Sequence, residues 1–203
     1  MKIICIGRNY VDHIKELNNE MPEDPVIFFK PETALITRNQ PFFYPSFSKD
    51  IHHEVEIVVK ISKHGKNIEE KFATKYFDQI GIGIDFTASD LQAKAKSKGL
   101  PWTLAKGFNG AAPVSNFKPV SDYKDIHDLN FHLELDGKVV QQGNTSLMIY
   151  KIESVIAYIS RFIMLKKGDL IFTGTPQGVG PVKIGHNLKA YIEGEKLLDF
   201  NVR

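Results

Sequence analysis

Cysteine is almost absent from this chain: one residue, Cys5, occurs among 203. A lone thiol excludes a disulfide framework within the chain and is typical of a protein from a reducing compartment. Cys5 stands between isoleucine residues, where a cysteine usually serves as a small core hydrophobe. The cysteine and histidine residues also lack the spacing that binds structural zinc.

An excess of charge of one sign is also missing, because the formal net charge is only +2 at pH 7. Lysine and arginine do not gather with interleaved aromatic residues, as they do in many nucleic-acid-binding proteins. No apolar run approaches the length of a membrane span, and a strand-like run from Lys2 to Gly7 stands where a targeting segment would begin. We therefore expect a cytoplasmic protein without a nucleic-acid or membrane partner.

Linkers, internal repeats and low-complexity segments are missing too, which predicts a single domain over residues 1–203. Apolar residues recur instead with the periods of short strands and helices. The expected strands cover residues 2–7, 26–29, 54–61, 79–86, 131–135, 138–140 and 170–172, followed by a hairpin around Gly194. The expected helices cover residues 11–17, 69–77, 88–98 and 151–163. The predicted fold class is therefore α+β and rich in strands.

The most informative run is residues 52–59, with the sequence His-His-Glu-Val-Glu-Ile-Val-Val. Side chains alternate along a strand, so Glu54 and Glu56 share one face, while Val55 and the alternating apolar residues after it share the other. Taken alone, this pattern is typical of a half-buried strand with one face in water. Two carboxylates so close together repel each other unless water or a cation lies between them.

A third carboxylate, Asp85, ends the expected strand 79–86, in an apolar setting where a lone acid needs a partner or a metal. We expect Thr87 to cap the helix that follows, with Asp90 in its first turn, so that Asp85 is free for another role. Together with Glu54 and Glu56, Asp85 would form an all-oxygen site. Such a site favours Mg²⁺ or Mn²⁺, with several water ligands left to exchange.

Three further features of the sequence bear on a functional site, but each is less specific than the three carboxylates. Lys106 is the only charge in an apolar loop, and it is either a snorkelling surface lysine or a cation aimed at an anionic ligand. His13 and Glu16 lie three residues apart on a short helix, either as a weak surface pair or as a histidine base oriented by its carboxylate. The glycine-rich segment 173–181 lacks the Gly-Lys-Ser/Thr ending of a phosphate-binding loop, so nucleotide binding is not expected.

Five motifs occur in the order in which one known family has them. They are Gly-Arg-Asn-Tyr at 7–10, His-Glu-x-Glu at 53–56, Asp-x-Thr-Ala-x-Asp-Leu-Gln at 85–92, Leu-Ala-Lys-x-Phe at 104–108 and Thr-Gly-Thr-Pro-x-Gly-Val-Gly at 173–180. With them the chain resembles the fumarylacetoacetate hydrolase family, and most of all its short acylpyruvase and oxaloacetate decarboxylase branch. Each motif alone is weak, whereas five in order are specific.

The resemblance implies a mixed β-roll fold with a short N-terminal lid helix, and a homodimer. It also implies that Glu54, Glu56 and Asp85 are the ligands of Mg²⁺ or Mn²⁺. One position departs from the pattern, because the chain has Ser89 where relatives usually carry arginine. That departure puts the anchoring of a distal substrate carboxylate in doubt.

The same resemblance implies roles around a small 2-keto-acid substrate. His13 and Glu16 would activate a water molecule from the lid, and Lys106 would stabilise the negative charge of an enolate. The groups that would surround the substrate are Arg8, Gln92 and Thr175.

The reaction that this arrangement favours is metal-dependent hydrolysis of the C–C bond of 3-acylpyruvates, with oxaloacetate decarboxylation as a possible second activity. The second hypothesis is an isomerase or tautomerase of 2-hydroxy-dienoate or oxaloacetate type. Such an enzyme would use the same metal, but its proton transfer would follow a different path from that of hydrolysis. A non-catalytic relative that binds a cation or a keto acid is the third hypothesis. The presence of His13 and Glu16 favours hydrolysis, since isomerisation needs no activated water.

Overall fold

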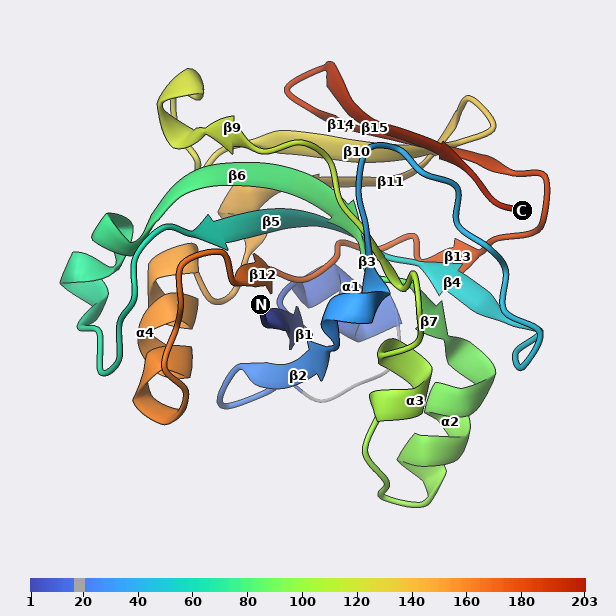
Figure 1. Cartoon of the computed structure of the whole chain (residues 1–203), viewed down its shortest axis with the longest axis horizontal. Helices are drawn as coiled ribbons and strands as arrows, with labels where there is room; N and C mark the ends of the chain where they lie inside the picture. The colour runs from blue at the N-terminus through green and yellow to red at the C-terminus, as the bar shows by residue number, and fades with distance from the viewer. Residues whose placement is uncertain (17–20) are drawn as a thin grey trace.

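A mixed six-stranded sheet, built from the runs rich in isoleucine, valine and phenylalanine, lies at the centre of the molecule (Figure 1). The computed structural model describes residues 1–16 and 21–203, except for the side chains of His13 and Lys15. In spatial order the strands of this sheet are β2 (Val26–Lys30), β1 (Ile3–Gly7), β12 (Leu170–Phe172), β5 (Val55–Ile61), β6 (Phe77–Ile84) and β9 (Lys118–Pro119). β1 runs parallel to β12, and the other neighbours are antiparallel.

Three smaller sheets surround it in the described part of the chain. The four-stranded sheet has the order β11 (Lys138–Asn144), β10 (Asn130–Leu135), β14 (Asn187–Ile192) and β15 (Glu195–Asn201). The others are β13 (Gly180–Pro181), β4 (Ile51–His53) and β7 (Thr87–Ala88), and the pair β3 (Leu35–Ile36) and β8 (Ala112–Pro113). The strand-rich α+β prediction is therefore confirmed.

Helices α2 and α3 lie together at one end of the molecule, α4 lies at the other, and α1 lies between them (Figure 1). Their bounds are α1 (Val11–Glu16), α2 (Ser89–Ser97), α3 (Thr103–Lys106) and α4 (Ile152–Phe162). Short 3-10 turns are η1 (Glu32–Ala34), η2 (Glu70–Tyr76), η3 (Val120–Asp122) and η4 (Thr145–Leu147). Most predicted elements are present within one or two residues of the expected bounds, while the end of the predicted helix 11–17 lies outside the described residues.

β5 is buried on both faces, and here the pattern taken alone misleads. Residues Val55–Val59 are all buried, because the four-stranded sheet packs over β5 and β6 (Figure 1). Glu56 is accordingly only 1% exposed and has no wet face to point into. A carboxylate held so deeply needs charged or hydrogen-bonding partners, and these define the site described below.

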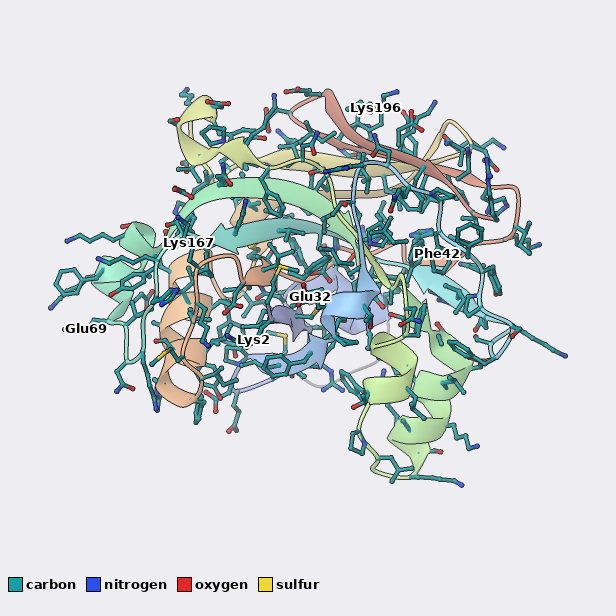
Figure 2. The ribbon with its side chains drawn as sticks, viewed as in Figure 1. Lys2, Glu32, Phe42, Glu69, Lys167 and Lys196 are labelled. Carbon is teal, nitrogen blue, oxygen red and sulfur yellow. The ribbon has the colours of Figure 1, made fainter. Side chains whose placement is uncertain are left out.

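Charged side chains elsewhere are spread over the periphery rather than gathered in a patch. Figure 2 shows Glu69, Lys167 and Lys196 pointing outward from different parts of the molecule.

Among the described residues, no helix combines the length and apolar character that crossing a membrane would require.

Candidate active site and metal centre

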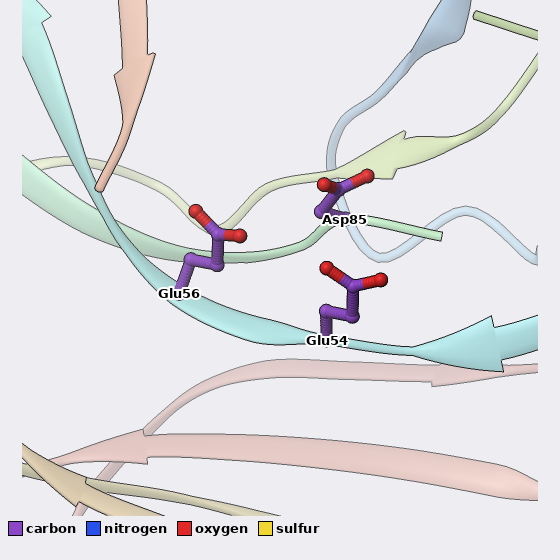
Figure 3. Close-up of side chains that lie close together, drawn as sticks. All are labelled: Glu54, Glu56 and Asp85. Carbon is purple, nitrogen blue, oxygen red and sulfur yellow. The ribbon is translucent and has the colours of Figure 1, made fainter. Parts of the chain in front are cut away.

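Three carboxylates converge where the central sheet meets β4. Glu54 lies between β4 and β5, Glu56 lies in β5, and Asp85 directly follows β6. The antiparallel register pairs Val55 with Ile84, and the N–H of Asp85 donates to the carbonyl of Glu54 at 2.8 Å. One oxygen from each carboxylate lies within 4.8 Å of the others, and Figure 3 shows the three side chains close together. The structure thus brings together the three residues predicted as metal ligands.

Glu56 is fixed from the far side by the loop that follows β12. The backbone N–H of Gly174 donates to Glu56 Oε2 at 2.7 Å. Gly174 has φ +100, and a Cβ there would lie 2.7 Å from the Cβ of Asn9, so only glycine fits this turn. Burial raises the pKa of Glu56 well above its ordinary value, and the charges of Asp85 and Glu54 raise it further.

Lys106 lies directly against two of the carboxylates. It is the last residue of α3, and its Nζ donates to both Glu54 oxygens, at 2.9 and 3.0 Å, and to Asp85 Oδ2 at 2.7 Å. Burial lowers the pKa of Lys106, but the charges of Asp85 and Glu54 outweigh it, so the net shift is upward. The side chain is therefore a fixed ammonium, and the interpretation of Lys106 as a snorkelling surface lysine is wrong.

Lys30, which the sequence reading did not identify, is the second cation of the site. Its fully buried Nζ lies 2.7 Å from Asp85 Oδ1 and donates to the carbonyls of Phe86, at 3.0 Å, and Lys106. A lysine that closes the apolar strand β2 just before Pro31 was the available signal. Lys30 ties β2 to the ends of β6 and α3, and so holds both Asp85 and Lys106 in place.

The charges of this cluster suit a hard divalent cation. Three carboxylates against the ammonium groups of Lys30 and Lys106 leave one net negative charge in a buried site. The converging groups offer oxygen ligands only, which Mg²⁺ and Mn²⁺ prefer. The residues present therefore fit the predicted cation, which would share Glu54 and Asp85 with Lys106.

The predicted substrate-binding residues meet at a narrow cavity above the carboxylates. Arg8, Gln92 and Thr175 all line this cavity, which has a volume of about 50 Å³. Arg8 has φ +58, a conformation that is uncommon for a residue other than glycine and that recurs at functional sites. Ser89, at the start of α2, is not among the lining residues. The lining also includes Phe28, Lys96 and Trp102, which the sequence reading did not assign to the site.

Gln141, from β11, is a buried positioning residue that the sequence reading also missed. Its Nε2 donates to Thr175 Oγ1 at 2.9 Å and to the carbonyl of Pro176 at 3.0 Å. Its Oε1 accepts from the N–H of Val55 at 3.0 Å and lies 2.8 Å from His53 Nδ1. Gln141 therefore couples the loop that carries Thr175 to the start of β5. A glutamine at a buried strand position was the only signal, and it indicates no partner by itself.

The predicted helix cap is wrong, because Thr87 serves the site instead. β7 pairs with β4 and holds Thr87 in an extended conformation, and the hydroxyl donates to Glu54 Oε1. Ala88 occupies the N-cap position of α2 and makes no side-chain cap. Pairing with β4, which sequence periodicity does not reveal, thus gives Thr87 its role.

The predicted lid contacts the glycine-rich segment through one of its two proposed catalytic residues. Glu16, at the end of α1, accepts from the N–H of Gly178 at 3.1 and 3.2 Å. The backbone of His13 lies in α1, but its side chain lies outside the described residues. The pairing of His13 with Glu16 therefore stays a prediction.

Comparison with known proteins identifies relatives over nearly the whole chain. A profile of the family described as fumarylacetoacetate (FAA) hydrolase C-terminal matches residues 2–202. The chain is 43% identical over 201 residues to the mitochondrial oxaloacetate tautomerase of Mus musculus, which covers 99% of this chain and 91% of that protein. It is 44% identical over 194 residues to the mitochondrial oxaloacetate decarboxylase of Dictyostelium discoideum, covering 95% and 89%.

A solved structure supports the fold. Fumarylpyruvate hydrolase from Pseudomonas aeruginosa, in complex with Mn²⁺ and pyruvate, superimposes with a TM-score of 0.94 at 32% identity. The match covers 100% of this chain and 89% of that one. The fold expected from the resemblance is thus confirmed. Because the two relatives above are mitochondrial proteins, the cytoplasmic location stays a prediction.

Proposed function

The chain belongs to the fumarylacetoacetate hydrolase family, and we propose that it is a divalent-metal-dependent enzyme that enolises oxaloacetate. Keto–enol tautomerisation is the main reaction of this proposal, and decarboxylation is a second outcome of the same enolate chemistry. The sequence alone favours acylpyruvate hydrolysis, whereas we now place oxaloacetate tautomerisation first. Relatives named as oxaloacetate tautomerase and oxaloacetate decarboxylase support the change.

The observation that carries the proposal is the ammonium group of Lys106, fixed among carboxylates at the floor of the cavity. In enolisation a base takes a C3 proton of the substrate, the electron pair of that bond leaves negative charge on the oxygen at C2, and protonation of this oxygen gives the enol. A preorganised ammonium in a buried site stabilises such a charge without having to reorient during the reaction. Lys30 keeps this ammonium in position through the backbone carbonyl of Lys106.

Glu54, Glu56 and Asp85 are the residues that would hold Mg²⁺ or Mn²⁺. When bound, the cation would act as a Lewis acid that polarises the 2-keto group. Thr175, held by Gln141, and Gln92 would orient the substrate, and their position in the lining of the same cavity supports this role. The Mn²⁺ and pyruvate in the Pseudomonas aeruginosa relative support this choice of metal and ligand class.

A direct comparison of substrates tests the proposal. The purified chain is assayed for interconversion of enol and keto oxaloacetate, for decarboxylation and for cleavage of acetylpyruvate, with Mg²⁺, with Mn²⁺ and with a chelator. We expect interconversion of oxaloacetate to be fastest, and to disappear with the chelator. Free metal without protein gives the background rate. Cleavage of acetylpyruvate without any oxaloacetate turnover would overturn the proposal.

Acylpyruvate hydrolysis is the second candidate, and an apolar groove beside the site favours it. This groove, of about 640 Å³, is lined by residues 26–31 and 100–103 and shares Phe28, Trp102 and Lys106 with the narrow cavity. It offers an acyl chain an apolar surface. The contact of Glu16 with Gly178 also places α1 against the loop that carries Thr175.

His13→Ala separates acylpyruvate hydrolysis from oxaloacetate decarboxylation. Hydrolysis needs a base that deprotonates water, a contribution of about 10²–10⁴-fold, whereas decarboxylation of a β-keto acid needs none. We expect the variant to lose acetylpyruvate cleavage by that factor and to keep oxaloacetate decarboxylation. Steady-state rates with both substrates on one preparation provide the measurement. Equal losses would show that His13 positions the substrate or closes the site, and that it is not the base.

We further propose that the chain is a homodimer, which light scattering of the purified protein tests. Large apolar side chains on the surface support this, among them Leu104, which is 78% exposed, and Phe43, which is 68% exposed.

A further inference from the structure

The mouth of the narrow cavity carries two cations besides Lys106. Arg8 follows β1 and Lys96 lies near the end of α2, and both line the cavity. Within the described part of the chain, neither residue forms an ion pair with a carboxylate. Two unpaired cations at the entrance to a buried anionic cluster are not needed to neutralise that cluster. They point to a second anionic group that arrives with the ligand.

Lys96 is directed toward the cavity by the geometry of α2 and by Trp102. Gln92 and Lys96 are four residues apart, so they lie on the same face of the helix, and both line the cavity. The Nζ of Lys96 lies over the ring of Trp102, 5.5 Å from its centroid. Burial and the charges of Arg8 and Lys106 lower the pKa of Lys96, and the opposing charge of Glu54 does not offset them.

We propose that Lys96, together with Arg8, binds the second carboxylate of a 2-oxo dicarboxylic acid and so makes the site selective for diacids. This inference rests on the proposed function for the placement of the first carboxylate and the keto group near Glu54, Glu56 and Asp85. The distal carboxylate of a four-carbon diacid then lies toward the mouth, on the side of Arg8 and Lys96. The small volume of about 50 Å³ favours such a short acid over a bulky one.

Binding of two matched ligands tests the inference without relying on turnover. Malate and lactate each offer a carboxylate and an adjacent hydroxyl, but only malate has a second carboxylate. Calorimetry in the presence of Mg²⁺ is expected to show that the unaltered chain binds malate about tenfold or more tightly than lactate. Lys96→Met should remove most of that difference by weakening malate alone, and Lys96→Arg should restore it. Lys94→Met, an exposed change on the same helix, should leave both affinities unchanged.

The outcomes separate this inference from the proposed function. No preference for malate in the unaltered chain, or an undiminished preference in Lys96→Met, would overturn the role of Lys96. Equal weakening of malate and lactate would show that Lys96 only supports the structure, and would also overturn it. A chain that lacks oxaloacetate turnover but shows a malate preference dependent on Lys96 would refute the proposed function and leave the diacid site standing.

Discussion

Replacing Lys106 by methionine is expected to lower oxaloacetate turnover by about 10²–10³-fold, because it removes the ammonium that faces the developing enolate. The same change should leave Mg²⁺ affinity unchanged or increased. The three carboxylates would then be balanced by Lys30 alone, so the cluster would carry two net negative charges instead of one. Steady-state kinetics at saturating Mg²⁺ and metal titration by calorimetry measure the two effects on the same preparation.

The stability of this variant needs a control, since buried Asp85 and Glu54 lose a partner. Breaking a buried ion pair from one side can cost about 3–5 kcal/mol, and bound Mg²⁺ should offset part of that cost. Thermal unfolding with and without Mg²⁺ reports on it. Lys98→Met, just after α2, is the matched control and should keep full activity. A Lys106→Met variant that is folded and fully active would refute the enolate-stabilising role.

Replacing Glu56 by glutamine is expected to weaken Mg²⁺ binding by at least about 10–100-fold, with the fold retained. Glutamine has nearly the same shape and can still accept from the N–H of Gly174, but it removes one of three negative charges. The loss of activity should be largely rescued by high Mg²⁺, which distinguishes this variant from Lys106→Met. Metal titration and activity as a function of Mg²⁺ concentration provide the measurements.

The pH dependence of metal binding gives the same prediction a second readout. Burial and the neighbouring carboxylates raise the pKa of Glu56, so protons compete with the cation for this ligand. Mg²⁺ affinity of the unaltered chain should therefore rise with pH up to the raised pKa of Glu56, and this rise should be smaller in Glu56→Gln. Glu69→Gln, an exposed change of the same kind, should alter neither affinity nor its pH dependence. Unchanged Mg²⁺ affinity in Glu56→Gln would contradict the ligand assignment.

Sequence periodicity was enough to find the carboxylates but not their surroundings. Alternation along a strand places Glu54 and Glu56 on one side, and Asp85 follows a second apolar run, so local pattern predicts three acids near two strand ends. That β5 and β6 pair in register, and that a second sheet covers them, depends on contacts between distant segments. The depth of burial of Glu56 was therefore not predictable from its neighbours in sequence.

The partners of the carboxylates escaped the sequence reading for the same reason. Lys30 and Gln141 have ordinary sequence neighbours, and each meets the site only through tertiary packing, with Asp85 and with Thr175 respectively. Thr87 has a sequence context that suits a helix cap, but pairing with β4 turns its hydroxyl to Glu54. Polar residues whose partners lie far away in the sequence are thus the positions where local rules gave the least guidance.

The bond from Gly174 to Glu56 also bears on the order in which the protein assembles. β5 and β6 are neighbours in sequence, and Lys30 and Lys106 lie within the first 106 residues, so the acids and their lysines can meet early. Gly174 reaches Glu56 when β12 pairs with β5, a contact between residues 118 positions apart in the chain. Contacts between such distant segments form slowly. We therefore expect tight metal binding to be a late event in folding.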